Sequence, residues 1–304
     1  MTNLGIALGG GGARGLAHIG ILKVLDREKI PIHSITGCSM GAVVGGLYAY
    51  FGNASEVERF VDDALKNPKF AHLNLDNLSE DQNGKKDEGF INKFTDFVQD
   101  RIAALRAIRE VSVIDKEETD RIFSLIPNPK IKSLKFKFSA IATDLLTGKE
   151  INFTEGNLRD VLRASSAIPG IFPPVKIDGQ LLVDGSASES VPVSKVKEFC
   201  SDRILAVDVT RNINSPGALN NAIEIVFRTQ DISSHHLSKE RLKEADLVIS
   251  PKVKQYLWSD FKFAKRIIKL GEEEAEKRLP EINKLMNRNY YVLEFEHFLK
   301  KFKS

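Results

Sequence analysis

Gly37, Cys38, Ser39, Met40 and Gly41 form a G-x-S-x-G pattern. Glycines on both sides of a serine allow a sharp turn between a strand and a helix, with the hydroxyl exposed at its tip. Ser39 is therefore the predicted nucleophile. Cys38 is a rival, but it precedes the turn residue, so its side chain is expected to point elsewhere as a small packed thiol.

A glycine-rich loop at residues 9–15, GGGGARG, follows a short apolar run. Consecutive glycines leave backbone amides open to a ligand, and the helix expected behind them adds positive dipole character. The loop could hold either a bound phosphate or an oxyanion formed during a reaction. A purely structural glycine turn is a further interpretation.

Gly10, Gly12 and Gly15 also satisfy the dinucleotide-binding pattern G-x-G-x-x-G. A cofactor-binding oxidoreductase is thus an alternative function. Such a protein is expected to carry Asp or Glu at the end of its second strand, to bind the ribose. Residues 37–39, Gly-Cys-Ser, occupy that place instead, which counts against this alternative.

A serine hydroxyl needs a base to remove its proton before it attacks. The candidates among the six histidines are His18, His33, His72, His235, His236 and His297. The chain order Ser, Asp, His allows a triad of Ser39, Asp184 and one of the last three histidines. This triad is disfavoured, since its serine normally follows several strands and Ser39 follows two.

Strand and helix patterns alternate along the chain. Apolar runs predict strands at residues 4–8, 32–36, 136–143, 151–153, 175–184, 204–209 and 245–249. Helical spacing occurs at 16–25, from 40 onward and at 90–108. The fold class expected is α/β, with a mainly parallel central sheet between two helical layers.

One domain at residues 1–280 is expected, followed by a basic amphipathic segment at 281–304 packed on it. Residues 66–118 are either core-facing helices or a mobile lid over a site.

Of the 304 residues, 42% are hydrophobic and 28% are charged, which excludes a disordered chain. The net charge of +3 gives no indication of nucleic-acid binding.

Only two cysteines occur, and the N-terminus lacks the pattern of an export signal, so a cytoplasmic location is expected. The longest nearly apolar stretch, residues 40–51, is well short of the ~20 residues that a membrane-crossing helix needs. It is predicted to be a buried helix.

Four motifs in this order resemble the patatin-like phospholipases, most closely compact bacterial members. They are GGGGARG at 9–15, GCSMG at 37–41, RASSAIPGIFPP at 163–174 and Asp-Gly at 184–185. The resemblance covers about residues 4–210. Ser186 departs from it, because the family more often has glycine or alanine after the Asp-Gly pair.

The resemblance implies a Ser-Asp dyad without histidine, in which Ser39 is the nucleophile and Asp184 is the general base. It implies an oxyanion hole in the glycine loop, built from Gly9, Gly10, Gly11, Gly12 and Arg14. No cofactor and no metal are implied. The expected substrate is a phospholipid, a lysophospholipid or another fatty acyl ester. A regulatory scaffold that kept the fold without catalysis is a second, non-enzymatic alternative.

A second Asp-Gly pair stands at 178–179, between two apolar runs, where a hairpin turn is expected. Spacing alone leaves Asp178 and Asp184 both open as the base, and the family resemblance selects Asp184. Asp144, in the sequence ATDLLTG, is interpreted as a structural residue of a loop.

Two basic amphipathic stretches could rest transiently on anionic lipid, which would make the protein peripheral to a membrane. The first combines Trp258, Phe261 and Phe263 with Lys262, Lys265, Arg266 and Lys269. The second combines Phe298, Leu299 and Phe302 with Lys300, Lys301 and Lys303. Helices packed by their aromatic residues, with the lysines in water, are the alternative interpretation.

Overall fold

The centre of the fold is a mainly parallel sheet. A computed structural model describes residues 2–71, 111–211, 213 and 222–287. In these ranges eight strands pair in the order β5-β6-β3-β2-β1-β7-β8, with β4 against β3. The strands are β1 (Leu4–Leu8), β2 (Ile32–Cys38), β3 (Lys137–Asp144), β4 (Glu150–Phe153), β5 (Val175–Ile177), β6 (Gln180–Asp184), β7 (Arg203–Val207) and β8 (Leu247–Ile249).

The neighbouring strands β3, β2, β1, β7 and β8 run parallel to one another. Strands β4 and β6 are antiparallel to β3, and β5 is antiparallel to β6. All five residues of β1 and of β7 are buried, as expected of strands covered on both faces. The predicted strand at 175–184 is divided into β5 and β6 by a two-residue turn at Asp178 and Gly179. Both turn residues have positive φ, at 48° and 80°, so the hairpin prediction is confirmed.

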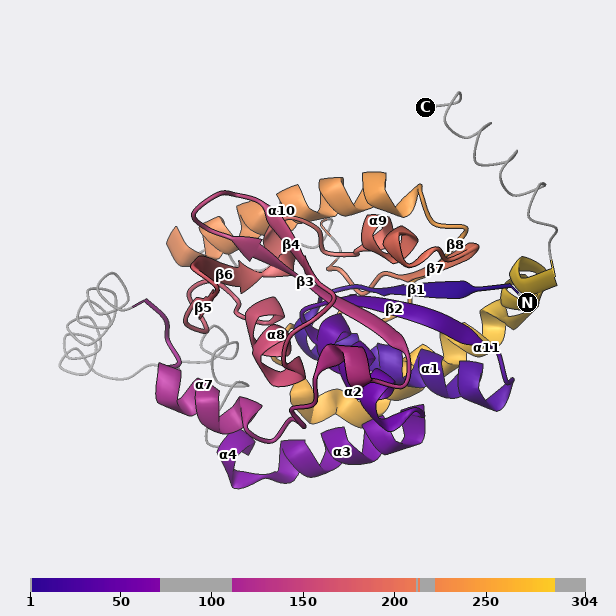
Figure 1. Ribbon diagram of the computed structural model, residues 1–304, viewed down its shortest axis with the longest axis horizontal. Helices are drawn as coiled ribbons and strands as arrows, with labels where there is room; N and C mark the ends of the chain where they lie inside the picture. Colours follow the sequence, from indigo (N-terminus) through magenta and orange to yellow (C-terminus); the bar gives the residue numbers. More distant parts are fainter. Residues whose placement is uncertain (1, 72–110, 212, 214–221, 288–304) are drawn as a thin grey trace, which may run out of the picture.

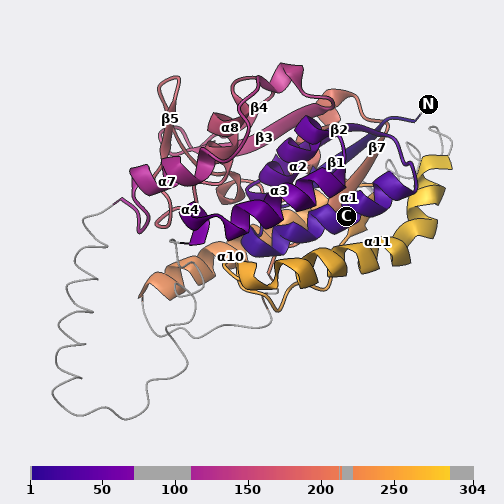
Figure 2. The same ribbon diagram turned by 90° about the horizontal axis from the view of Figure 1, so that it is seen from below.

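Helices cover both faces of the sheet and make three layers (Figures 1 and 2). They are α1 (Ala17–Arg27), α2 (Met40–Phe51), α3 (Ala54–Lys66), α4 (Pro68–Ala71), α7 (Lys116–Phe123), α8 (Leu158–Ser165), α9 (Val193–Val196), α10 (Ala222–Leu242) and α11 (Ala264–Asn287). Helices α9 and α10 lie on one face, and α1, α2, α8 and α11 lie on the other. The predicted three-layer α/β fold is confirmed.

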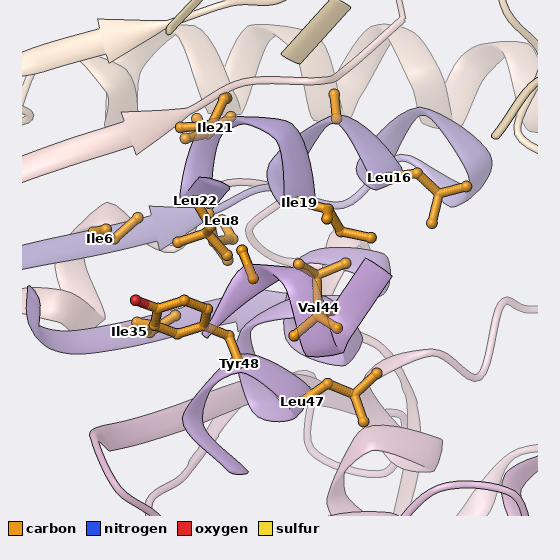
Figure 3. Packing of buried hydrophobic residues seen from close by; sticks show 14 of the residues in the cluster. Ile6, Leu8, Leu16, Ile19, Ile21, Leu22, Ile35, Val44, Leu47 and Tyr48 are labelled. Atoms are coloured by element: carbon orange, nitrogen blue, oxygen red, sulfur yellow. The ribbon is translucent and has the colours of Figure 1, made fainter. Parts of the chain in front are cut away.

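The larger hydrophobic core fills the face under α1 and α2 (Figure 3). Alternate strand residues such as Ile6, Leu8 and Ile35 point into it and meet α1 and α2. The Asp26 carboxylate accepts hydrogen bonds from the Tyr48 hydroxyl at 2.6 Å and from the backbone amide of Ala54 at 2.7 Å. These bonds tie α1, α2 and the start of α3 together behind the sheet.

The predicted boundary at residue 280 falls inside α11, which continues to Asn287. The rest of the C-terminal segment, residues 288–304, lies outside the described residues. Residues 72–110 of the predicted lid region also lie outside them. The helix expected at 90–108 falls there too. The separate C-terminal segment and the lid therefore stay predictions. Among the described residues, no helix combines the length and apolarity needed to cross a bilayer.

Candidate active site

The loops that follow β1 and β2 lie at the same edge of the sheet, because the two strands are parallel and neighbouring. Across the sheet, Cys38 of β2 pairs with Ile141 of β3, and the next residue, Ala142, pairs with Asp184 of β6. Strand register thus brings Asp184 close to Ser39, although the two residues are 145 positions apart in the chain. The glycine loop completes the cluster, since a side chain at Gly10 would meet Ser39 Cβ at 3.2 Å.

Ser39 occupies a strained turn between β2 and α2. Its φ of 52° and ψ of −123° lie in a region that residues with a side chain rarely adopt. Its backbone amide donates a hydrogen bond of 3.1 Å to the hydroxyl of Ser165, the last residue of α8. The fold therefore holds the turn that the G-x-S-x-G pattern predicts.

The two flanking glycines allow α2 to start against the sheet. A Cβ atom on Gly41 would lie 2.2 Å from the carbonyl oxygen of Leu8 in β1, and one on Gly37 would lie 2.4 Å from the backbone of Ala42. Both contacts are far closer than real Cβ atoms allow, and backbone atoms cannot step aside as a flexible side chain does. The glycines are thus required by backbone packing at the turn.

Asp184 is almost completely buried at the end of β6, with 1% of its surface exposed. Burial raises the pKa of its carboxyl, while hydrogen bonding from the side chain of Ser39 and from Ser186 opposes that rise. The Ser186 amide donates to Oδ1 at 2.8 Å, and the amide of Asp184 itself donates to the Ala167 carbonyl at 2.9 Å. The carboxylate is therefore held in place by these bonds and is partly desolvated beside Ser39.

The Cys38 thiol is buried and packed, as the sequence predicts, but it also contacts Asp184. Its Sγ donates a weak hydrogen bond of 3.8 Å to Asp184 Oδ1. Burial, followed by the nearby Asp184 and Glu189 carboxylates, raises the pKa of the thiol well above its usual range. Since the thiolate is the reactive form, this environment disfavours Cys38 as a nucleophile.

The amides of the glycine loop are divided between two uses. Gly9 donates to the Val207 carbonyl at 3.0 Å, and Gly10 donates to the Ser190 carbonyl at 2.8 Å. Among the described residues, Gly11 and Gly12 have no acceptor for their amides, as expected at the start of the 3₁₀ turn η1 (Gly12–Leu16). Only these two of the four expected glycines thus present free donors.

The Arg14 side chain is buried and is turned toward the backbone behind the loop. Its guanidinium donates to the carbonyls of Val209 and Tyr256, at 3.0 Å each. Desolvation lowers its pKa to about 10, so it stays charged at neutral pH. These bonds give Arg14 a structural role, holding the loop against segments that follow β7 and β8. The place in the oxyanion hole that the resemblance implies for Arg14 stays a prediction.

His18, in the first turn of α1, supports the glycine loop from below. Its Nε2 lies 2.7 Å from the Gly9 carbonyl oxygen, and its ring is completely buried. Burial lowers its pKa to about 4, so the ring is neutral at neutral pH and Nε2 carries the hydrogen. Sequence reasoning had considered this histidine only as a possible base. His18 lies nine positions after Gly9 in the chain, so no local sequence pattern indicates this contact.

No described histidine is hydrogen-bonded to Ser39 or Asp184. His33 lies near the Phe199 carbonyl, at 3.3 Å, and His235 and His236 lie side by side on α10. His72 and His297 lie outside the described residues. The geometry therefore brings together the dyad and does not bring together the alternative triad within the described part of the chain.

The two other candidate aspartates have structural positions. Asp178 forms the turn between β5 and β6. The Asp144 carboxylate accepts hydrogen bonds from the amides of Leu146 and Leu181 and from the Thr147 hydroxyl. Asp144 thus organises the turn after β3, as predicted from the sequence.

An apolar cavity of about 140 Å³ opens at Ser39. Gly12, Ser39 and Ser166 belong to its lining, and the other lining residues are hydrophobic, mainly from α2, α3, α7 and the segments 168–172 and 258–261. Trp258 and Phe261, expected on a lipid-facing surface, are among these lining residues. Of that aromatic set, Phe263 is the exposed member, at 42%. Two of the three aromatic residues of the first basic stretch therefore line the cavity.

Comparison with known proteins identifies relatives over this part of the chain. The family model of patatin-like phospholipases matches residues 6–196. An uncharacterized NTE family protein of Mycobacterium bovis is 31% identical over 211 residues, which are 69% of this chain and 50% of that protein. A lysophospholipase, nte1, of Neurospora crassa is 29% identical over 229 residues, which are 74% of this chain and 13% of that protein.

The chain thus matches about half the length of the mycobacterial relative, and far less of the fungal one. Among solved structures, VipD from Legionella pneumophila aligns with 92% of this chain and 67% of its own, at a TM-score of 0.46 and 14% identity. Human GIVD cytosolic phospholipase A2 aligns with 94% of this chain and 60% of its own, at a TM-score of 0.45 and 12% identity.

Proposed function

Because the chain belongs to the patatin-like phospholipase family, we propose that it is a serine hydrolase of fatty acyl esters, acting through Ser39 and Asp184. The observation that carries this proposal is the position of the strained Ser39, which lines an apolar cavity and lies against the buried Asp184 carboxylate, where its side chain lowers the pKa of that carboxyl. A strained serine, a desolvated carboxylate and free amides together match the requirements of acyl transfer.

In the first half of the reaction, the Ser39 oxygen attacks the ester carbonyl carbon while its proton passes to Asp184. The carbon–oxygen bond to the alcohol then breaks, and the alcohol leaves with the proton from Asp184. In the second half, water gives a proton to Asp184 and attacks the acyl carbon; the bond to the Ser39 oxygen then breaks, Asp184 returns the proton to that oxygen, and the fatty acid leaves. Burial supports this role of Asp184, because its raised pKa makes it a stronger base than an exposed aspartate.

We assign the oxyanion of the tetrahedral intermediate to the amides of Gly11 and Gly12. Those of Gly9 and Gly10 already donate to carbonyls of the main chain, and Gly12 lines the cavity beside Ser39. Losing one such donor costs about 10²- to 10³-fold in rate in other hydrolases. Gly9, Gly10 and Arg14 then act by holding the loop in place.

The cavity supports an acyl chain as the group bound next to Ser39. Its lining is almost entirely hydrophobic, so the favourable term for binding is the removal of apolar surface from water. The fungal relative is called a lysophospholipase, which supports a phospholipid or lysophospholipid as the source of that chain. Glycerol-based or other esters with the same acyl chain share this chemistry.

We propose that the exposed residues at the start of α11 contact anionic lipid during turnover. Phe263 is exposed beside Lys262, whose Nζ lies 5.6 Å from its ring centre, and Lys265 and Arg266 are exposed one turn further on. These residues adjoin Phe261, which lines the cavity, so the basic surface and the cavity share one segment. An ester in a membrane surface would then lie near Ser39.

The proposed function is tested with a fluorophosphonate probe and a short acyl ester. The wild-type protein should be labelled and should turn over the ester, and Ser39→Ala should abolish both. Asp184→Asn should abolish turnover with the fold retained by circular dichroism. Ser133→Ala, which changes an exposed serine, should behave as wild type.

Two outcomes would contradict the proposal. An unlabelled and inactive wild-type protein would favour the regulatory scaffold, or the oxidoreductase if it bound NAD(H) tightly. A folded protein that lost turnover as the joint His235→Ala and His236→Ala variant would favour the triad of Ser39, Asp184 and a histidine. In either case the dyad would be rejected.

A further inference from the structure

The hydroxyl of Ser166 is buried without a hydrogen-bond partner among the described residues. The residue follows directly after α8 and lines the cavity that opens at Ser39. A buried hydroxyl without a partner is unfavourable, because it loses its bonds to water and gains none in the protein. Such a group therefore requires an explanation.

The backbone groups of Ser166 are already paired, and its hydroxyl takes part in none of these bonds. Its amide donates to the carbonyls of Leu162 and Arg163, at 3.1 and 3.3 Å, and its carbonyl accepts from Ile168 at 2.9 Å. The backbone amide of Ser39 is served by the preceding residue, Ser165. The side chain of Ser166 takes no part in these bonds.

Ser166 lies between two residues that contact the dyad. Ser165 accepts the hydrogen bond from the Ser39 amide, and the Ala167 carbonyl accepts the one from the Asp184 amide. Ser39 and Ser166 are the two hydroxyl-bearing residues of the lining that the structure describes. A substrate ester placed for attack by Ser39 would thus bring its polar atoms to the part of the cavity where Ser166 lies.

An ester offers two oxygens at the reacting carbon. In the reaction proposed above, the carbonyl oxygen is taken by the amides of Gly11 and Gly12, which leaves the oxygen of the departing alcohol. We propose that the Ser166 hydroxyl donates a hydrogen bond to this leaving oxygen, so that Ser166 is a substrate-contacting residue. The inference rests on the proposed function.

The hydrogen bond would matter most as the carbon–oxygen bond breaks, because negative charge then develops on the leaving oxygen. The proton that completes the alcohol comes from Asp184, which had received it from Ser39. Ser166 keeps its own proton and contributes only the hydrogen bond. Its effect should therefore grow as the alcohol becomes a poorer leaving group.

The test compares wild type with Ser166→Ala on two series of esters. One series keeps the acyl chain and changes the alcohol from p-nitrophenol to ethanol, and the other keeps p-nitrophenol and lengthens the acyl chain. We expect kcat/KM of Ser166→Ala to fall about 10- to 100-fold for the ethyl ester and less than about threefold for the p-nitrophenyl ester. The loss should not depend on acyl length.

Two further variants serve as controls. Ser166→Thr keeps a hydroxyl and should restore most of the activity on the ethyl ester. Ile168→Val, which changes an apolar residue of the same cavity, should show losses that grow with acyl length and not with the alcohol. The melting temperature of Ser166→Ala should stay within a few degrees of wild type, because no bond in the fold is lost.

A Ser166→Ala protein with equal losses for both alcohols, or with losses that follow acyl length, would overturn the inference. A marked fall in its melting temperature would do so as well, by showing a structural role. In those cases fluorophosphonate labelling of Ser39 in the wild-type protein would leave the proposed function standing. An unlabelled, inactive wild type would overturn both.

Discussion

Glu189 lies near the candidate active site, and its protonation should make the stability of the fold depend on pH. Its side chain is 1% exposed, and one oxygen accepts a hydrogen bond of 3.0 Å from Ser194 while the other has no hydrogen-bond partner among the described residues. Burial, and next the charge of Glu150, raise its pKa from 4.5 to about 7. The following residue, Ser190, accepts the amide of Gly10, so Glu189 belongs to the segment that joins Asp184 to the glycine loop.

The raised pKa fixes the sign of the effect on stability. The folded protein binds the Glu189 proton more tightly than the unfolded chain, so this group stabilises the fold fully below about pH 4.5 and loses that contribution as the pH rises through about 7. The difference between a pKa of 4.5 and one of about 7 corresponds to about 3 kcal/mol. Glu189→Gln resembles the protonated form and does not titrate. The unfolding free energy of Glu189→Gln minus that of wild type should therefore rise by about 3 kcal/mol from pH 4.5 to pH 8.

The assay is urea unfolding of both proteins at pH 4.5, 6 and 8, with the difference in unfolding free energy taken at each pH. Glu198→Gln, which changes a half-exposed carboxylate nearby, is the matched control and should show a difference that changes by less than about 1 kcal/mol. A difference between Glu189→Gln and wild type that is the same at pH 4.5 and pH 8 would refute the reasoning.

Two further predictions concern the turn at Ser39 and the basic surface at the start of α11. Gly41→Ala should lower the unfolding free energy by about 2 to 3 kcal/mol in urea titrations, because its Cβ would meet the Leu8 carbonyl at 2.2 Å. Gly46→Ala, on the same helix but against flexible side chains at 3.0 Å or more, should change it by less than about 1 kcal/mol; equal losses would contradict this account. Sedimentation with anionic vesicles should weaken with salt and in Lys265→Glu, but not in Lys277→Glu, an exposed lysine later in α11; equal binding by both variants would exclude the proposed surface.

The fold could be predicted from local patterns because its central strands are short apolar runs that end in glycine or turn residues. The Asp-Gly pair at 178–179 indicates its hairpin, and the glycines around Ser39 indicate a sharp turn. In each case neighbouring residues carry the signal, since the backbone conformation at the turn demands them. Helix α11, 24 residues long, was missed as a single element, and it contains Pro280 in its interior.

The parts of the site that sequence reasoning missed depend on contacts between distant segments. His18 meets a carbonyl nine positions away, and Arg14 bonds the carbonyls of Val209 and Tyr256. The division of the glycine amides follows from the placement of Val207 and Ser190, which only the packed sheet determines. A glycine run shows that amides are accessible but does not show which of them are already occupied.

Contacts between distant segments also support the proposal that Asp184, and not a histidine, is the base. An exposed aspartate is a weak base, but Asp184 is enclosed by the sheet, and burial raises its pKa. Its hydrogen bonds from Ser186 and from the side chain of Ser39 oppose full protonation, so the carboxylate is less stabilised than in water yet still available to accept a proton. Register between β3 and β6 sets this position, since Asp184 pairs with Ala142 one residue beyond the partner of Cys38. A slip of one residue in that register would turn the carboxylate to the opposite face of the sheet and separate it from Ser39.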